Sequence, residues 1–282
     1  MRADSSLNPT KRYSTPFLKW AGGKRWLVNR HSNVFPDFNG RYFEPFLGGG
    51  SVFFHLAPKT AFLSDANGTL IECYQQIRDE HETVVEILED HQKKHCKDYY
   101  YETRSAKFEN PSYRAAQFLY LNRTCWNGLY RVNLKGEFNV PIGTKSTVLF
   151  EHDNFSAIAK LLEDTTLSQC DFEKTIDRAE AGDFIFVDPP YTVKHNFNGF
   201  LKYNERIFSW EDQVRLRDAV VRASDRGAKV LVTNAAHCSV LDLYSEIGTV
   251  RHIKRGSVLA GKREARGVFE EILVSINMDI IE

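Results

Sequence analysis

Hydrophobic and polar positions along this chain follow two rhythms. Phe184 to Val187 is a continuous apolar run, and a run of this length is typical of a strand buried in a parallel sheet. From Trp210 to Arg226 the apolar residues instead recur at the spacing of an amphipathic helix. Strand-like runs that alternate with helical segments predict an α/β protein with a mostly parallel sheet.

The same rhythm extends over both ends of the chain. Strands are expected at 41–46 and 61–64, on either side of a glycine-rich turn and a helix, which is a βαβ start. The later pattern predicts a helix at 154–163, strands at 165–169 and 229–233, and an antiparallel pair of 250–253 with 271–276 around a basic loop.

The alternation stops in the middle of the chain. Apolar residues at helical spacing predict helices between residues 70 and 121. Asn127-Gly128 and Lys135-Gly136 are turn dipeptides, so the stretch is expected to end in a hairpin or loop. We therefore expect one domain built from residues 1–66 and 151–282, interrupted by an insertion at 67–150.

The composition narrows the class of protein. Its 282 residues are 42% hydrophobic and 26% charged, as in a soluble globular chain. We find no apolar run long enough to cross a membrane, and the polar segment 1–14 is not expected to be a secretory signal. The five scattered cysteines form no Cys-x-x-Cys pair, which predicts free thiols in a reducing cytoplasm.

The charge balance does not by itself indicate nucleic acid. The chain has 37 basic and 37 acidic residues, which gives a formal net charge of zero. Basic residues concentrate at 11–30 and 251–266, and acidic residues at 79–90, so a basic face could coexist with an acidic back. The alternative is that these runs are ordinary solvated surfaces.

Asp188-Pro189-Pro190-Tyr191 follows the apolar run 184–187 and carries the most chemistry. Two prolines make a stiff corner, because they fix two φ angles and remove two N–H donors. The Asp188 carboxylate and the Pro189 carbonyl could accept both hydrogens of an amino group on a planar ring, and Tyr191 could stack on that ring. Adenine and cytosine both satisfy this description.

A glycine-rich turn, Phe46 to Ser51, follows the first expected strand, and Asp65 ends the next one. Gly48 and Gly50 would let a ligand approach the backbone, and an acid at that strand end can bind ribose hydroxyls. The third glycine of a dinucleotide fingerprint would fall at Phe53, which favours a nucleoside-type cofactor over NAD. The alternative is a tight turn with a capping aspartate.

Two further segments mix aromatic, basic and glycine residues. Lys19 to Lys24 is not a Walker A loop, but Trp20 could stack on a ring and Lys24 could hold a carboxylate. In 122–131, Arg and Asn could read bases and an aromatic or Leu could enter the base stack, although a packed hairpin with surface arginines is the simpler interpretation.

Two remaining features have weaker implications. Segment 196–203 could be a lid over the proline corner or an exposed loop. His91 and His95 lie four residues apart with Cys96 adjacent, but no further ligand pair is evident, so we expect no metal site.

Taken in order, these segments resemble the bacterial and phage DNA adenine-N6 methyltransferases of the Dam type. The turn, Asp65 and the proline corner all follow strands, whose carboxyl ends form one crevice in an open α/β sheet. The resemblance covers nearly the whole chain beyond the polar N-terminus. It rests on the segments 19–24, 43–51 with Asp65, 121–123, 127–131, 136–141 and 188–191.

The resemblance implies a Rossmann-like, mostly parallel sheet of the methyltransferase type with an antiparallel edge strand, S-adenosylmethionine as methyl donor, and a target-recognition insertion at 67–150. The implied catalytic residues are Asp188, Pro189 and Tyr191. The cofactor-binding residues would be Trp20, Lys24, Phe46, Gly48, Gly50, Asp65 and Asp188, and the DNA-binding residues Lys19, Arg123, Trp126, Asn127, Leu129 and Arg131.

The reaction implied by the resemblance is methylation of N6 of an adenine flipped out of double-stranded DNA, within GATC. We expect a monomer that needs no metal ion and has no membrane partner. An RNA or protein-amide methyltransferase and a DNA-binding protein without catalysis are the alternatives. The sequence leaves open whether the enzyme protects DNA from a partner nuclease in restriction–modification or acts alone. Trp126, where some relatives carry Tyr or Phe, leaves the finer sequence preference open as well.

Overall fold

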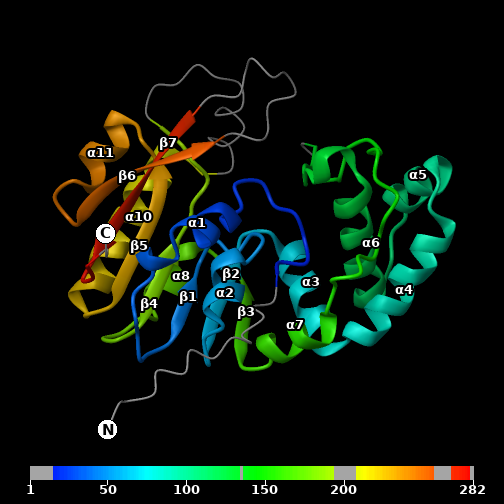
Figure 1. The fold of residues 1–282 in the computed structure, drawn as a ribbon, viewed down its shortest axis with the longest axis horizontal. Helices are drawn as coiled ribbons and strands as arrows, with labels where there is room; N and C mark the ends of the chain where they lie inside the picture. Colours follow the sequence, from blue (N-terminus) through cyan, green and yellow to red (C-terminus); the bar gives the residue numbers. More distant parts are fainter. Residues whose placement is uncertain (1–14, 134–135, 194–207, 257–267, 280–282) are drawn as a thin grey trace, which may run out of the picture.

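A seven-stranded sheet in the order β3-β2-β1-β4-β5-β7-β6 forms the centre of the molecule (Figure 1). The computed structural model describes residues 15–133, 136–193, 208–256 and 268–279, so the expected lid at 196–203 lies outside the described residues. The strands are β1 Tyr42–Glu44, β2 Ala61–Asp65, β3 Thr165–Gln169, β4 Phe184–Val187, β5 Lys229–Ala235, β6 Thr249–Gly256 and β7 Val268–Ile276.

Helices occupy most of the connections between these strands. The α-helices are α1 Arg25–Arg30, α2 Ser51–Leu56, α3 Gly68–Asp79, α4 His81–Lys94, α5 Lys97–Ser105, α6 Pro111–Thr124, α7 Phe155–Leu162, α8 Phe172–Ile176, α10 Trp210–Asp225 and α11 Cys238–Tyr244. Two 3-10 helices, η1 Ser32–Val34 and η2 Trp126–Gly128, complete the helical segments among the described residues.

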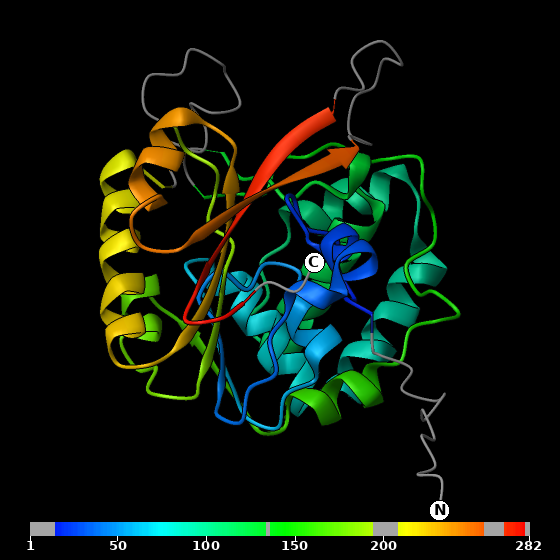
Figure 2. The ribbon, with the colours of Figure 1, turned by 60° about the vertical axis from the view of Figure 1, so that its left-hand side comes forward.

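The sheet separates two hydrophobic cores, because successive side chains of a strand point to opposite faces. In β4, Phe184 and Phe186 pack with α1, α2 and α3, whereas Ile185 and Val187 pack with α8, α10 and α11. Figure 2 shows the sheet between these two helix layers. The alternation also fixes the face on which any polar side chain at a strand end lies.

The expected α/β architecture is confirmed. β1 to β5 pair in parallel, and β7 runs antiparallel between β5 and the edge strand β6. The pairing of 250–253 with 271–276 is therefore correct. Four short helices were not predicted, because five to nine residues with mixed polarity give no clear helical period. These are α1, α5, α8 and α11.

Helices α4, α5 and α6 lie beyond the β3 edge of the sheet, on the right of Figure 1. Helix α3 connects them to that edge, since Gln75 donates to the Leu167 carbonyl and Arg78 to the Thr165 carbonyl. After η2, Val132 and Phe138 form an isolated antiparallel bridge, and Cys125 bridges Ile142. The loop after α6 thus folds back on itself by short pairings rather than by a regular hairpin.

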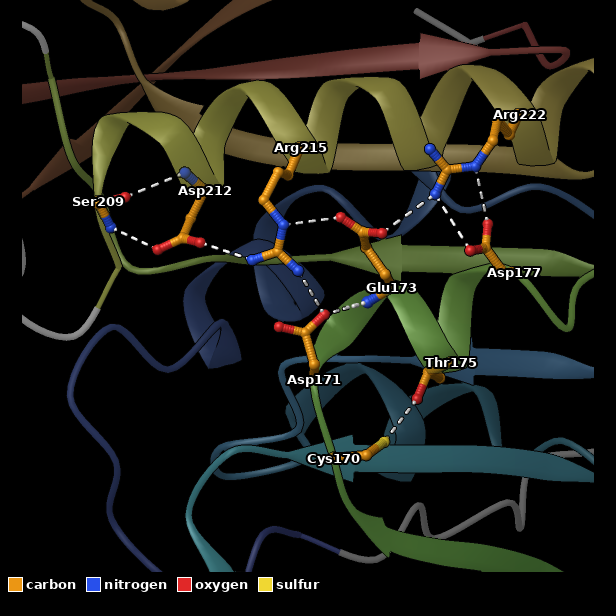
Figure 3. A network of polar contacts seen from close by, with 9 residues as sticks. All are labelled: Cys170, Asp171, Glu173, Thr175, Asp177, Ser209, Asp212, Arg215 and Arg222. Atoms are coloured by element: carbon orange, nitrogen blue, oxygen red, sulfur yellow. Dashed lines mark hydrogen bonds and ion pairs between the residues drawn. The ribbon is translucent and has the colours of Figure 1, made fainter.

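An ion-pair network fastens α10 to α8 on the other face of the sheet (Figure 3). Arg215 contacts Asp171 and Glu173, while Arg222 contacts Glu173 and Asp177. The residues are largely exposed, so each pair contributes little stability by itself. The network nevertheless fixes the helix that follows β3 against the helix that precedes β5.

Among the described residues, no helix is long and apolar enough to cross a membrane. All five cysteines are free thiols, of which Cys96 and Cys238 are exposed.

Candidate active site

The site lies where the order of the sheet reverses, between β1 and β4. β1 and β4 are parallel neighbours, with Tyr42 opposite Phe184. On their outer sides, β1 is next to β2 and β4 is next to β5. Their carboxyl ends therefore open into a crevice of the kind in which α/β proteins bind ligands. The glycine-rich turn follows β1, and Asp188 follows β4.

The glycine-rich turn has a backbone that other residues rarely adopt. Gly48 has a φ of +48° and Gly50 a φ of +63°, both in the left-handed region. A Cβ atom at Gly48 would lie 2.6 Å from the Trp20 ring. The turn thus requires glycine both for its conformation and for the close approach of Trp20.

Asp65 holds this turn in place. Its Oδ2 accepts the Gly48 N–H at 3.0 Å, and its Oδ1 accepts the Asn67 N–H at 2.9 Å. Burial raises the pKa of the Asp65 carboxyl, while the backbone N–H donors of Asn67 and Gly48 partly counter this rise. Since each carboxylate oxygen can accept more than one hydrogen bond, Asp65 retains acceptor capacity for a ligand.

Two aromatic residues flank the turn. Trp20 is half-buried and stacks on Tyr130, with ring centroids 5.2 Å apart and planes 21° apart. Phe46 is also half-buried and stacks on Phe172, with centroids 5.5 Å apart. The structure thus brings Trp20, Phe46, Asp65 and the glycines together, as the sequence predicted them to lie.

Asp188 lies in a polar cluster at the end of β4. Its Oδ1 is 2.7 Å from Lys24 Nζ and accepts the Thr233 hydroxyl hydrogen at 2.6 Å. Burial raises the pKa of the Asp188 carboxyl, and the charge and hydrogen bond of Lys24 partly counter the rise. Lys24 is itself only 3% exposed and also donates to the Gly22 carbonyl. Two segments far from Asp188 in the sequence therefore fix one of its carboxylate oxygens.

Tyr191 points its hydroxyl into the same cluster. The hydroxyl donates to Glu271 Oε2 at 2.7 Å, and Lys24 Nζ lies 5.0 Å from the centre of the ring. Burial, followed by the nearby Asp188 and Glu271 charges, raises the pKa of Tyr191 well above its ordinary value. The hydroxyl consequently stays protonated and remains a donor at neutral pH.

Three residues of this cluster were not singled out from the sequence: Glu44, Thr233 and Glu271. Burial raises the pKa of Glu44 to about 8, although its hydrogen bond from the Tyr42 hydroxyl favours the ionised form. For Glu44, the sequence offered one signal, namely a charged residue at an inward-facing position of an apolar strand. Strand pairing was needed to show that Glu271 of β7 lies near the end of β4.

The residues expected to approach DNA lie in two different environments. Trp126 is 53% exposed, and Asn127 and Arg131 are exposed as well. Leu129 between them is half-buried. Asn127 has a φ of +58°, so the chain turns sharply in η2 and presents Trp126 and Asn127 at its surface. Four of the predicted residues thus share one short, largely exposed segment.

Lys19 lies beside this segment because Asn122 anchors its backbone. Lys19 N–H donates to Asn122 Oδ1 at 2.9 Å, and Asn122 Nδ2 donates to the Lys19 carbonyl at 2.8 Å. A Cβ atom at Gly128 would lie 2.4 Å from the Lys19 side chain, which shows how closely the two segments pack. Asn122 therefore ties segment 19–24 to the end of α6.

Arg123 occupies a different place from the one predicted. It is 1% exposed, and its guanidinium donates to the Asp153 carboxylate, the Phe17 carbonyl and the Val148 carbonyl. The Phe150 ring lies 4.7 Å from the guanidinium carbon. A side chain that is committed to so many internal partners is not placed to reach a base, so we assign Arg123 a structural role.

The histidines at the end of α4 have internal partners. His91 Nδ1 lies 2.8 Å from the Tyr99 hydroxyl, and His95 Nδ1 lies 2.9 Å from the Tyr120 hydroxyl. Burial lowers the pKa of His91 to about 4. Within the described ranges, no group of three or more His, Cys, Asp or Glu side chains could hold a metal ion.

Comparison with known proteins identifies the family. The chain is 36% identical over 278 residues to the type II methyltransferase M1.LlaDCHI of Lactococcus lactis subsp. cremoris, which covers 95% of this chain and 98% of that protein. It is 34% identical to the DNA adenine methylase of Haemophilus influenzae, over 81% of this chain and 82% of that protein.

The DNA adenine methylase of Escherichia coli K12 is 32% identical, over 77% of this chain and 80% of that protein. Residues 20–258 match the family described as D12 class N6 adenine-specific DNA methyltransferase. This range includes the glycine-rich turn, the proline corner and segment 126–131. The chain therefore belongs to the D12 class of N6 adenine-specific DNA methyltransferases.

Proposed function

We propose that this methyltransferase uses S-adenosylmethionine to methylate N6 of an adenine flipped out of duplex DNA, within GATC. The observation that carries the proposal is the fixed carboxylate of Asp188, whose Oδ1 is held by Lys24 at 2.7 Å and Thr233 at 2.6 Å. Both described donors reach Oδ1, so we assign Oδ2 to the adenine amino group.

The amino nitrogen of adenine is a weak nucleophile, because its lone pair is delocalised into the ring. In our proposal, Asp188 Oδ2 and the Pro189 carbonyl accept its two hydrogens, which favours a pyramidal nitrogen with a directed lone pair. The half-buried Tyr191 ring stacks on the flipped base. Positioning and electrostatics then supply most of the catalysis.

The residues around the glycine-rich turn fit a cationic nucleoside cofactor. Left-handed Gly48 and Gly50 keep side chains away from the turn, and Asp65 retains acceptor capacity. Asp188 and Glu271 place two carboxyl groups beside the cation Lys24, at 2.7 Å and 3.7 Å from its Nζ, an environment favourable to a further positive charge. S-adenosylmethionine would supply a methyl group on a positively charged sulfur.

We assign DNA recognition to the exposed segment 126–131 together with Lys19. In this proposal Arg131 reads a guanine edge, Asn127 contacts the opened base pair, and Trp126 enters the base stack. Leu129 and Lys19 contact neighbouring bases. The GATC assignment rests on the resemblance of 127–131 and 136–141 to Dam-type enzymes, and Trp126 is the residue most able to alter it.

We further propose the corresponding division of labour along the chain. Residues 1–66 and 151–282 bind the methyl donor, and residues 67–150, together with Lys19 from the first segment, contact DNA. One chain supplies every residue of the proposed site, so a monomer suffices. The free thiols favour a reducing cytoplasm, and the similarity to M1.LlaDCHI favours a role beside a type II restriction endonuclease.

The proposal is tested by incubating the protein with labelled S-adenosylmethionine and unmethylated plasmid. Label should enter DNA as N6-methyladenine, and nucleases sensitive to GATC methylation should no longer cut. Transfer to cytosine, RNA or protein would contradict the acceptor. Transfer to adenine outside GATC would contradict only the recognition sequence.

A further inference from the structure

Glu271 is a buried carboxylate for which the proline corner offers no explanation by itself. It lies near the beginning of β7, and its side chain is 5% exposed. Because β7 runs antiparallel to β5, with Glu271 opposite Ala235, this end of β7 lies at the carboxyl end of β5. Glu271 is therefore in the same layer as the site.

The alternation along β7 also fixes the direction of its side chain. Ile272 and Val274 pack into the core beneath α10 and α11, whereas Leu273 packs into the opposite core. Glu271, two residues before Leu273, shares the face of Leu273. That face carries Lys24, so the carboxylate enters the polar cluster rather than the α10 core.

Glu271 closes a ring of interactions among side chains from three parts of the sequence. Its Oε2 accepts the Tyr191 hydroxyl hydrogen at 2.7 Å and lies 3.7 Å from Lys24 Nζ. Lys24 in turn contacts Asp188 Oδ1 and lies 5.0 Å from the Tyr191 ring centre. The two functional residues of the proline corner are thus linked through Glu271 and Lys24.

A stacking ring is useful only if its plane is fixed before the base arrives. The backbone holds Tyr191 at one end, and the bond to Glu271 holds its hydroxyl at the other. A hydrogen bond to an ionised acceptor is stronger than one between neutral groups. The Glu271 carboxylate also attracts the Lys24 ammonium group, so that Lys24 interacts with both Glu271 and Asp188.

We propose that Glu271 is a positioning residue of this methyltransferase, which fixes the Tyr191 ring for the flipped adenine and shares Lys24 with Asp188. The inference rests on the proposed function, because it takes adenine as the base that stacks on Tyr191. Glu271 touches neither the base nor the methyl donor in this account, and acts through Tyr191 and Lys24.

The test compares Glu271→Met, Tyr191→Phe and the double variant. Glu271→Met removes the acceptor, and Tyr191→Phe removes only the hydroxyl. Each single variant should lower kcat by about 10- to 100-fold with little change in the Kd for DNA. The double variant should be no slower than the slower single variant, because both changes break the same bond.

A second readout requires no methyl donor. Duplex DNA with 2-aminopurine at the target adenine reports stacking of the flipped base by its fluorescence. Glu271→Met and Tyr191→Phe should change that signal in the same direction. Glu270→Gln is the matched control, since Glu270 is the neighbouring residue, is 50% exposed and pairs only loosely with His252 at 3.9 Å. It should behave as wild type.

Glu271→Gln serves if Glu271→Met does not fold, because it keeps the shape and a polar group. Its amide has N–H groups that would face Lys24 or the Tyr191 hydroxyl, so kcat should still fall. A kcat and fluorescence equal to wild type, or losses that multiply in the double variant, would overturn the proposal. A wild-type protein without methyl transfer would instead overturn the proposed function.

Discussion

The polar cluster around Asp188 and the exposed segment 126–131 are built in opposite ways. Lys24 and the Glu271 side chain are 3% and 5% exposed, and hydrogen bonds and ion pairs connect the cluster across β4, β5 and β7. Trp126 is 53% exposed and lies on a tight turn. Segment 19–24 touches both regions, through Lys24 at one end and through Lys19, which packs against Gly128, at the other.

The difference separates two tasks. A buried cluster holds charges in fixed positions, and such preorganisation is what a chemical step needs. An exposed segment can adapt to the grooves and bases of DNA. We therefore expect substitutions in the cluster to affect turnover and its pH dependence, and substitutions in the segment to affect DNA binding and sequence preference.

The largest effect is expected at Asp188. Asp188→Ala removes the carboxylate that Lys24 and Thr233 hold in place and should lower the rate of methyl transfer by about 10²- to 10³-fold or more. Transfer of label to DNA measures the effect. Asp177→Asn, in the exposed network on α8, is the matched control and should keep wild-type activity. A wild-type rate from Asp188→Ala would remove the cluster from the chemistry.

Arg123 is buried and Arg131 is exposed, so the two arginines should respond differently to substitution. Arg123→Met leaves Asp153 without its buried partner and should lower the free energy of unfolding by about 3–5 kcal/mol. Arg131→Met, at an exposed position, should change it by no more than about 0.5 kcal/mol. Denaturant unfolding measures both values. Equal losses of stability would show that the two arginines do not belong to different environments.

For DNA recognition, Arg131→Met should have the larger effect and Arg123→Met the smaller one. Loss of a base contact typically costs about 1–3 kcal/mol of discrimination, so Arg131→Met should weaken binding and relax the sequence preference. Folded Arg123→Met protein should keep the wild-type preference, as tested with duplexes that differ at each base pair of the site. A relaxed preference in Arg123→Met would contradict its structural role.

The buried acid Glu44 should make stability depend on pH. Burial raises its pKa from 4.5 to about 8 in the folded protein, so ionisation favours unfolding. Its contribution is complete below pH 4.5, declines toward pH 8 at up to about 1.4 kcal/mol per pH unit, and is lost above that. In Glu44→Gln this decline should disappear. If stability declines with pH as steeply in the variant as in the wild type, Glu44 is already ionised in the folded protein.

A smaller effect is expected from Lys24. Burial raises the pKa of Asp188, and Lys24 lowers it by its charge and hydrogen bond. Lys24→Met should therefore move the acidic limb of the kcat/KM profile to higher pH, because Asp188 must be ionised to accept the amino hydrogen. Lys174→Met, an exposed lysine on α8, should leave the limb in place. A limb that moves to lower pH in Lys24→Met would contradict the pairing.

The sequence predicted the strands and helices whose apolar residues follow a regular local pattern. The apolar run 184–187 and the helical spacing in 210–226 appear as β4 and α10 almost to the residue. Because strands in such sheets end at one crevice, the sequence also predicted that the glycine-rich turn and Asp188 lie together. The family followed from the order of these segments.

Contacts between distant residues could not be predicted in the same way. Arg123 belongs to an Asn-Arg pair in a segment that resembles DNA-contacting segments, yet the last turn of α6 points it inward to Asp153. Glu271 is one of two adjacent glutamates, and only the pairing of β7 with β5 shows which of them is buried. Side-chain direction at an element's end depends on tertiary packing, which one sequence does not reveal.

The most direct test of the separation between chemistry and recognition is a single-turnover measurement at saturating DNA. Asp188→Asn and Arg131→Met, each loaded with labelled methyl donor, are compared on an excess of one duplex containing GATC, and only the first turnover is followed. We predict that Arg131→Met recovers to within about threefold of the wild-type rate, because saturation offsets weaker binding, whereas Asp188→Asn stays slow at every DNA concentration. Recovery of Asp188→Asn by added DNA, or failure of Arg131→Met to recover, would contradict the account.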